Sequence, residues 1–205
     1  MLASLVKDAV AKHELEECMK TLMMSCCFTV LLFGCSQNSV GPGPIPTPNT
    51  AMGNLAIVNT LAMSYHQGLR LMLVETGRDG VNIDGRASQW LYVYVTASTP
   101  YATYWFHADT NGIGLDSIGA VPPGSGAITQ AWFDSDSALA IAERNGGSQF
   151  RAQNPQSTVM AAVAQAVVPN PKSFWYISYY SNDNQEKALQ INVDANSGEA
   201  FVIEL

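Results

Sequence analysis

The chain has 205 residues, of which 47% are hydrophobic and 13% are charged, and its formal net charge is −7. This composition supports a packed core and excludes a long disordered charged chain. The Lys and Arg residues are too few and too scattered to form the clustered positive surface that phosphate backbones require, so we expect no nucleic-acid partner.

The cysteines all lie at the start of the chain, the last of them at position 35. They are Cys18, Cys26, Cys27 and Cys35. The remainder of the chain therefore has no thiol for a disulfide framework or for a cysteine metal site.

The apolar run from Thr21 to Phe33 follows Lys20 and is too short to span ~30 Å of hydrocarbon as a helix, which is typical of the core of a signal peptide. The sequence Leu32-Phe33-Gly34-Cys35 then resembles the lipobox of bacterial lipoproteins. The resemblance implies that Cys35 is lipidated, that its acyl chains anchor the protein in a membrane, and that 19–35 is the signal peptide. An ordinary cleaved signal or a buried amphipathic start remains the alternative.

Ser36, in place of Asp, follows the cysteine, which by the same resemblance implies the outer membrane of a Gram-negative bacterium. We interpret 1–18 as an extension from a misassigned start site. Residues 36–50 are rich in Gly and Pro and predict a polyproline II tether of roughly 45 Å at ~3.1 Å per residue. A proline-recognition ligand is the alternative for this segment.

Aromatic and turn residues recur at a fixed spacing in the rest of the chain. The pairs separated by 85 positions are Trp90 and Trp175, Tyr94 and Tyr179, Asp109 and Asp194, and Asn111 and Asn196. The spacing predicts an α+β fold of two tandem repeats, 51–124 and 125–205, each a helix packed on a small antiparallel sheet.

Helix signals precede the strands of each repeat. Asp134-Ser135-Asp136-Ser137 predicts the start of the second helix, because these side chains can accept hydrogen bonds from the amides of a first turn. Gly146 and Gly147 predict its end. The first repeat predicts the matching helix at 53–67, with His66 in its last turn.

Strand faces follow from alternation of apolar and polar residues. Leu189, Ile191 and Val193 are predicted to point inward, whereas Gln190 and Asn192 are predicted to point outward. By the repeat, Tyr104, Phe106 and Ala108 point inward, and Trp105 and His107 point outward. In the last strand, Phe201, Ile203 and Leu205 are predicted to share one face.

Three segments of the second repeat resemble PepSY-like domains. They are Asp136 to Glu143, Phe174-Trp175-Tyr176-Ile177-Ser178-Tyr179-Tyr180, and Ile191-Asn192-Val193-Asp194-Ala195-Asn196-Ser197-Gly198-Glu199. The first repeat is more divergent. The resemblance implies a module that associates with secreted peptidases.

The sequence contains only incomplete motifs for metal binding or catalysis. Asp109, Asn111 and Gly114 suit a calcium loop, but Ile113 and Ala120 stand where further oxygen ligands are needed. A Ser64, His107 and Asp116 triad can be drawn, but no nucleophile elbow or phosphate loop accompanies it. We expect no cofactor, no metal site and no catalytic residue.

The sequence therefore predicts a non-enzymatic lipoprotein whose repeats bind a protein or peptide and modulate a secreted peptidase, with Trp105, His107, Gln190 and Asn192 as the binding face. The alternative is a surface hydrolase or glycan-binding protein that uses His107, Asp109 and Asp116. A purely structural spacer is the third interpretation.

Overall fold

The computed structural model describes residues 49–97, 102–120, 126–166, 171–181 and 187–204. All of them belong to one compact unit, Ser39–Leu205. Cys35, the signal peptide and most of the tether lie outside the described residues.

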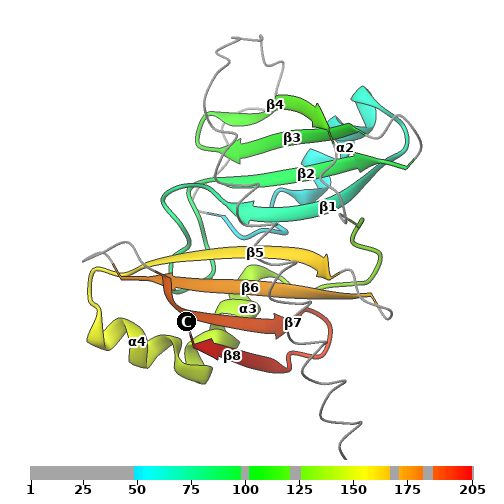
Figure 1. The fold of residues 1–205 in the computed structure, drawn as a ribbon. Helices are drawn as coiled ribbons and strands as arrows, with labels where there is room; N and C mark the ends of the chain where they lie inside the picture. The colour runs from blue at the N-terminus through cyan, green and yellow to red at the C-terminus, as the bar shows by residue number, and fades with distance from the viewer. Residues whose placement is uncertain (1–48, 98–101, 121–125, 167–170, 182–186, 205) are drawn as a thin grey trace, which may run out of the picture. The chain divides into compact units, whose positions relative to one another are not determined.

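One antiparallel sheet with the strand order β4-β3-β2-β1-β5-β6-β7-β8 runs through this unit (Figure 1). Its strands are β1 (Leu69–Thr76), β2 (Trp90–Thr96), β3 (Ala102–Asp109), β4 (Gly112–Ala120), β5 (Thr158–Ala166), β6 (Lys172–Tyr180), β7 (Lys187–Asp194) and β8 (Ala200–Glu204). The strands of the predicted repeats 51–124 and 125–205 meet where β1 pairs with β5. That pairing joins Leu73, Val74 and Glu75 to Ala164, Val163 and Ala162. The fold is therefore α+β, with a single continuous sheet.

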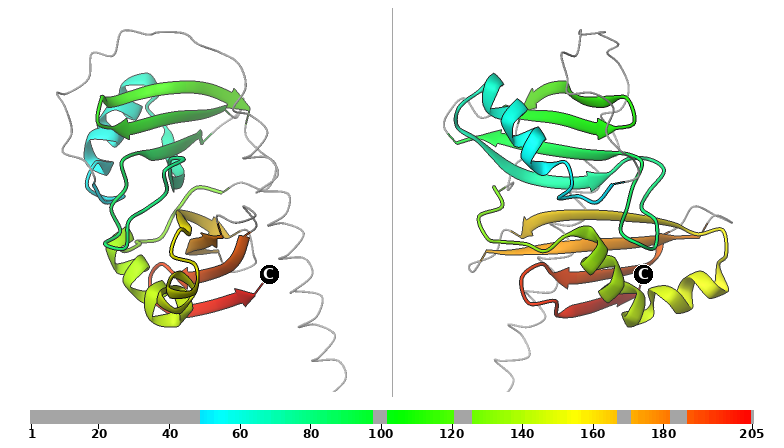
Figure 2. Two further views of the ribbon diagram at one scale, coloured as in Figure 1. Left: turned by 90° about the vertical axis from the view of Figure 1, so that its left-hand side faces the viewer. Right: turned by 180° about the vertical axis from the view of Figure 1, so that it is seen from behind.

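The helices cover one face of this sheet (Figure 2). Helix α2 (Leu55–Tyr65) lies behind β1 to β4, close to its predicted range of 53–67. Helices α3 (Ser135–Ala142) and α4 (Ser148–Gln153) lie behind β5 to β8. His66 caps the carboxyl end of α2 and is exposed.

The start of α3 is as predicted, because the Asp134 side chain accepts a hydrogen bond from the Ser135 amide. Its helical backbone breaks where predicted, because Gly146 has φ +121° and lies at a kink within η1 (Glu143–Gly147). Helix α4 follows directly as a separate helix, and its Arg151 forms an ion pair with Glu143 across the kink.

The main core fills the space between the helices and the sheet. Its largest fully buried side chains include Trp90, Trp175, Tyr92, Tyr94 and Tyr179. The rings of Trp90 and Trp175 meet edge to face with centroids 6.3 Å apart, so the core is continuous across both halves of the sheet.

Predicted strand faces are largely confirmed. Leu189, Ile191 and Val193 are buried in the main core, as are Phe106 and Ala108, and Tyr104 packs against it. The register places Phe201 and Ile203 on the opposite face, beside Asn192 and Gln190 respectively. Leu205 lies outside the described residues.

Gln190 and Asn192 point away from the helices, as predicted, but the prediction that they are exposed to solvent is wrong. Both lie on the face opposite the helices, but they are 0% and 8% exposed. The Gln190 side-chain amide donates to Asn192 Oδ1 at 2.6 Å, and β6 and β8 flank both residues. Alternation determines the face of a residue, whereas burial on an interior strand depends on its neighbours across the sheet.

Candidate functional site

The candidate site is the sheet face that carries no described helix, here called the helix-free face. Antiparallel sheets with one uncovered face usually present polar side chains on it. Here the strand register puts large apolar side chains there as well. They are Leu73, Leu91, Val93, Val95, Trp105, Phe174, Tyr176 and Phe201.

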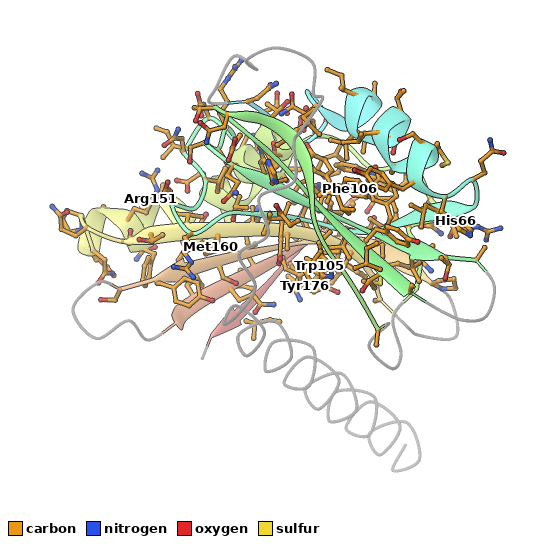
Figure 3. The ribbon with its side chains drawn as sticks, turned by 90° about the horizontal axis from the view of Figure 1, so that it is seen from above. His66, Trp105, Phe106, Arg151, Met160 and Tyr176 are labelled. Atoms are coloured by element: carbon orange, nitrogen blue, oxygen red, sulfur yellow. The ribbon has the colours of Figure 1, made fainter. Side chains whose placement is uncertain are left out.

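A second apolar cluster forms the centre of the helix-free face. Met72, Leu73, Val93 and Val95 are buried in it. Trp105 and Ala127 pack against its sides, and the segment of Ala127 is held there by the Ile128 amide, which donates to the Leu71 carbonyl at 2.7 Å. Trp105 is therefore half-buried and forms part of the wall of this cluster (Figure 3).

Glu75 lies at the border of this cluster, near the middle of the sheet. Its neighbours across the strands are Leu91 on β2 and Ala162 on β5. Burial raises the pKa of the Glu75 carboxyl to about 7, because the surrounding apolar side chains disfavour its charged form. Within the part of the chain that the structure describes, this carboxyl has no hydrogen bond or ion pair.

His107 and Asp116 form a pair on the same face, toward the β4 edge. His107 Nδ1 and Asp116 Oδ1 are 2.5 Å apart. The hydrogen bond to Asp116 raises the pKa of His107, although its partial burial acts in the opposite direction. Gly114 permits the arrangement, since a Cβ there would lie 2.7 Å from His107 Cε1.

Asp109 and Asp194 close matching turns. Asp109 Oδ1 accepts from the Asn111 amide at 2.7 Å, and Asp194 Oδ1 accepts from the Asn196 amide at 3.0 Å. Burial would raise the pKa of Asp194, but the Ser197 and Asn196 amides and the Lys172 ammonium outweigh it and hold that pKa at about 2. Both carboxylates thus support turns.

The structure brings together only some of the predicted site residues. Trp105 and His107 share β3 and the helix-free face, but four strands separate them from Gln190 and Asn192 on β7. Of the residues predicted for a hydrolase or glycan-binding site, His107 and Asp116 are in contact. The Asp109 carboxylate instead accepts a hydrogen bond within its own turn.

The catalytic triad considered from the sequence, Ser64, His107 and Asp116, is not formed. Ser64 belongs to α2, on the opposite face of the sheet, and its hydroxyl donates to the Leu61 carbonyl. Among the described residues no hydroxyl bonds to His107, so the pair can orient and hold a proton but has no nucleophile beside it.

Glu75 was missed by the sequence analysis. Its signal is a single acidic residue within Leu-Arg-Leu-Met-Leu-Val-Glu-Thr, an otherwise mostly apolar strand. A partly buried acidic residue with a shifted pKa is a candidate functional group.

Comparison of the chain with models of protein families, with curated proteins and with solved structures found no match. None of the helices that the structure describes is long and apolar enough to cross a membrane. Across the same described ranges, no group of three or more His, Cys, Asp or Glu residues could hold a metal ion.

Proposed function

We propose that the protein is a lipid-anchored, non-enzymatic binding module of the bacterial cell envelope, built from two PepSY-like repeats. It binds a protein or peptide on the helix-free face and in this way modulates a secreted peptidase. The anchor is Cys35, and the membrane is the outer membrane. The lipobox resemblance supports the location at the membrane, and the PepSY resemblance supports the class of partner.

Matched contacts support the proposed tandem repeat. The Trp90 indole donates to the Asn49 carbonyl and the Trp175 indole donates to the Phe133 carbonyl. The Tyr94 hydroxyl donates to Asn59 Oδ1, and the Tyr179 hydroxyl donates to Glu143 Oε1. Donors and acceptors in the second half thus lie 84 or 85 positions after their counterparts in the first.

One observation carries the binding proposal: aromatic side chains stay partly exposed on the helix-free face, beside the polar residues that an uncovered antiparallel sheet usually presents. Phe201 is 45% exposed, and Trp105, Phe174 and Tyr176 are half-buried. Exposed apolar and aromatic surface of this kind marks interaction sites, because its burial by a partner is favourable.

Site-specific photocrosslinking in native envelopes tests this proposal. A photoreactive phenylalanine at Phe201 on the helix-free face is compared with one at Ile57 on α2, whose exposure of 41% is similar. We expect a discrete protein adduct from position 201, absent from position 57 and reduced by Trp105→Ala. Equal adducts at both positions, or none at 201, would contradict the proposal.

The anchor has a separate test. Cys35→Ser removes the thiol that would carry lipid, so the protein is expected to leave the membrane fraction. Metabolic labelling with an alkyne fatty acid should mark the wild type and not the variant. Labelling that persists in the variant would contradict lipidation at Cys35.

A surface hydrolase or glycan-binding protein remains the alternative, favoured by the 2.5 Å contact of His107 with Asp116. A screen of hydrolase substrates and glycans decides it. Activity or binding that disappears in His107→Ala, with the fold retained, would favour this alternative over the protein-binding module.

A further inference from the structure

We propose that the partner presents a Lys or Arg side chain to Glu75. The inference rests on the proposed function, and it specifies the chemistry of the partner. The site consists of a single carboxylate within the apolar surface of the helix-free face.

Glu75 lies in the middle of one row of side chains that crosses the sheet. The row runs from His107 on β3 through Leu91, Glu75 and Ala162 to Tyr176 on β6. Strands lie ~4.8 Å apart, so His107 and Tyr176 are each roughly 10 Å from Glu75. Ala162 is the smallest member of the row and leaves the side of the carboxyl facing β6 uncrowded.

The other charged groups that the structure describes on this face leave Glu75 without a counter-ion. Asp116 pairs with His107, and Asp194 pairs with Lys172 at 2.9 Å. Arg70 is exposed near the start of β1, roughly 16 Å from Glu75 along the strand.

Charge complementarity therefore indicates which side chain of the partner lies against Glu75. A partner that covers the helix-free face removes the remaining water from Glu75, and an uncompensated buried carboxylate opposes binding. A Lys or Arg side chain of the partner would pair with the carboxylate. The aromatic ring of Tyr176, in the same row, offers additional attraction for a cation that lies between it and Glu75.

The chain itself offers no such cation in the segment that leads into the fold. Residues 36–69 contain neither Lys nor Arg. Lys7, Lys12 and Lys20 precede Cys35 and would be removed with the signal peptide. Among the described residues no Lys or Arg forms an ion pair with Glu75, so we assign the cation to another molecule.

A random peptide library displayed on phage is the probe, selected against the full chain held in detergent. Wild type, Glu75→Gln and the matched control Glu199→Gln are compared, because Glu199 is an exposed glutamate in the turn before β8. We expect wild type and the control to select peptides with a Lys or Arg at one position. Glu75→Gln should lose that preference and bind the selected peptides at least about 30-fold more weakly.

Selection of the same peptides by wild type and Glu75→Gln, or of peptides without a basic preference, would overturn the inference. The proposed function would survive that result provided that the adduct at position 201 forms. Absence of both selected peptides and the adduct would contradict the two proposals together. A Glu75→Lys variant that prefers acidic peptides would be a further positive result.

Discussion

Replacement of Glu75 by Gln is expected to stabilise the protein at alkaline pH and to have a much smaller effect at pH 5. The carboxyl is partly desolvated in the fold, and among the residues that the structure describes it has no ion pair or hydrogen bond. An uncharged amide of similar shape does not carry the cost of placing a negative charge in this environment.

The magnitude follows from the difference between the folded and unfolded pKa. The pKa of Glu75 is about 7 in the fold and 4.5 in the unfolded chain. Because the folded state binds the proton more tightly, the free energy of unfolding falls as pH rises from 4.5 through 7. At 1.36 kcal/mol for each pKa unit, the loss approaches about 3 kcal/mol above pH 7.

Urea unfolding followed by tryptophan fluorescence measures this effect at pH 5 and pH 8. Glu75→Gln, Glu199→Gln and wild type are compared at both values, so that other titrating groups cancel. The gain in stability of Glu75→Gln over wild type should be about 2.5 kcal/mol larger at pH 8 than at pH 5, where part of the wild-type loss has already occurred. An equal difference at the two pH values would show that Glu75 is solvated in the native protein.

Three further changes probe the rest of the structure. Asp116→Asn should lower the pKa of His107, because the hydrogen bond to Asp116 is the main cause of its elevation; an NMR titration in which that pKa does not move would show that the pair is absent. Asp194→Asn should cost about 2 kcal/mol at pH 7, and the loss should shrink as pH falls below 4 toward 2 in urea titrations, since the pKa of Asp194 is depressed. Trp90→Phe and Trp175→Phe should each cost about 2 kcal/mol in the same assay, because each replaces a fully buried indole by a smaller ring and removes its hydrogen bond to a part-buried carbonyl. A large effect of only one would oppose the proposed equivalence of the two halves.

The fold was largely predictable because its strongest signals are local. Alternation in β7 determined which side of the strand faces the core, and the Asp134 cap determined where α3 begins. The spacing of Trp90 and Trp175 predicted two similar strands, and both tryptophans are buried in strands of one core.

What the sequence patterns missed depends on contacts outside the strand or helix that carries the pattern. Gln190 is buried because β6 and β8 flank it, and the pattern of β7 alone does not contain that information. The glycines after α3 correctly predicted a break, but they did not predict that α4 follows directly, with Arg151 paired to Glu143 across the kink. Glycine permits a bend, whereas tertiary contacts determine whether the helix resumes.

Glu75 was not predictable for the same reason. Its environment is created by the pairing of β1 with β5, residues about 90 positions apart in the chain. That pairing puts a residue near the end of β1 at the middle of an eight-stranded sheet. A charged residue at a strand end is ordinarily solvated, so the strand sequence alone predicts the opposite surroundings.

The two halves of the sheet are joined by a short strand pairing and by further contacts in the buried core. Only three residue pairs connect β1 with β5, whereas Trp90 packs on Trp175 and the Ser135 hydroxyl donates to the Gly85 carbonyl. Buried contacts on the helix side therefore hold the sheet together across the position of Glu75. A partner bound there would contact β1 and β5 at once, so its affinity would depend on both halves even if its cation touches a single carboxylate.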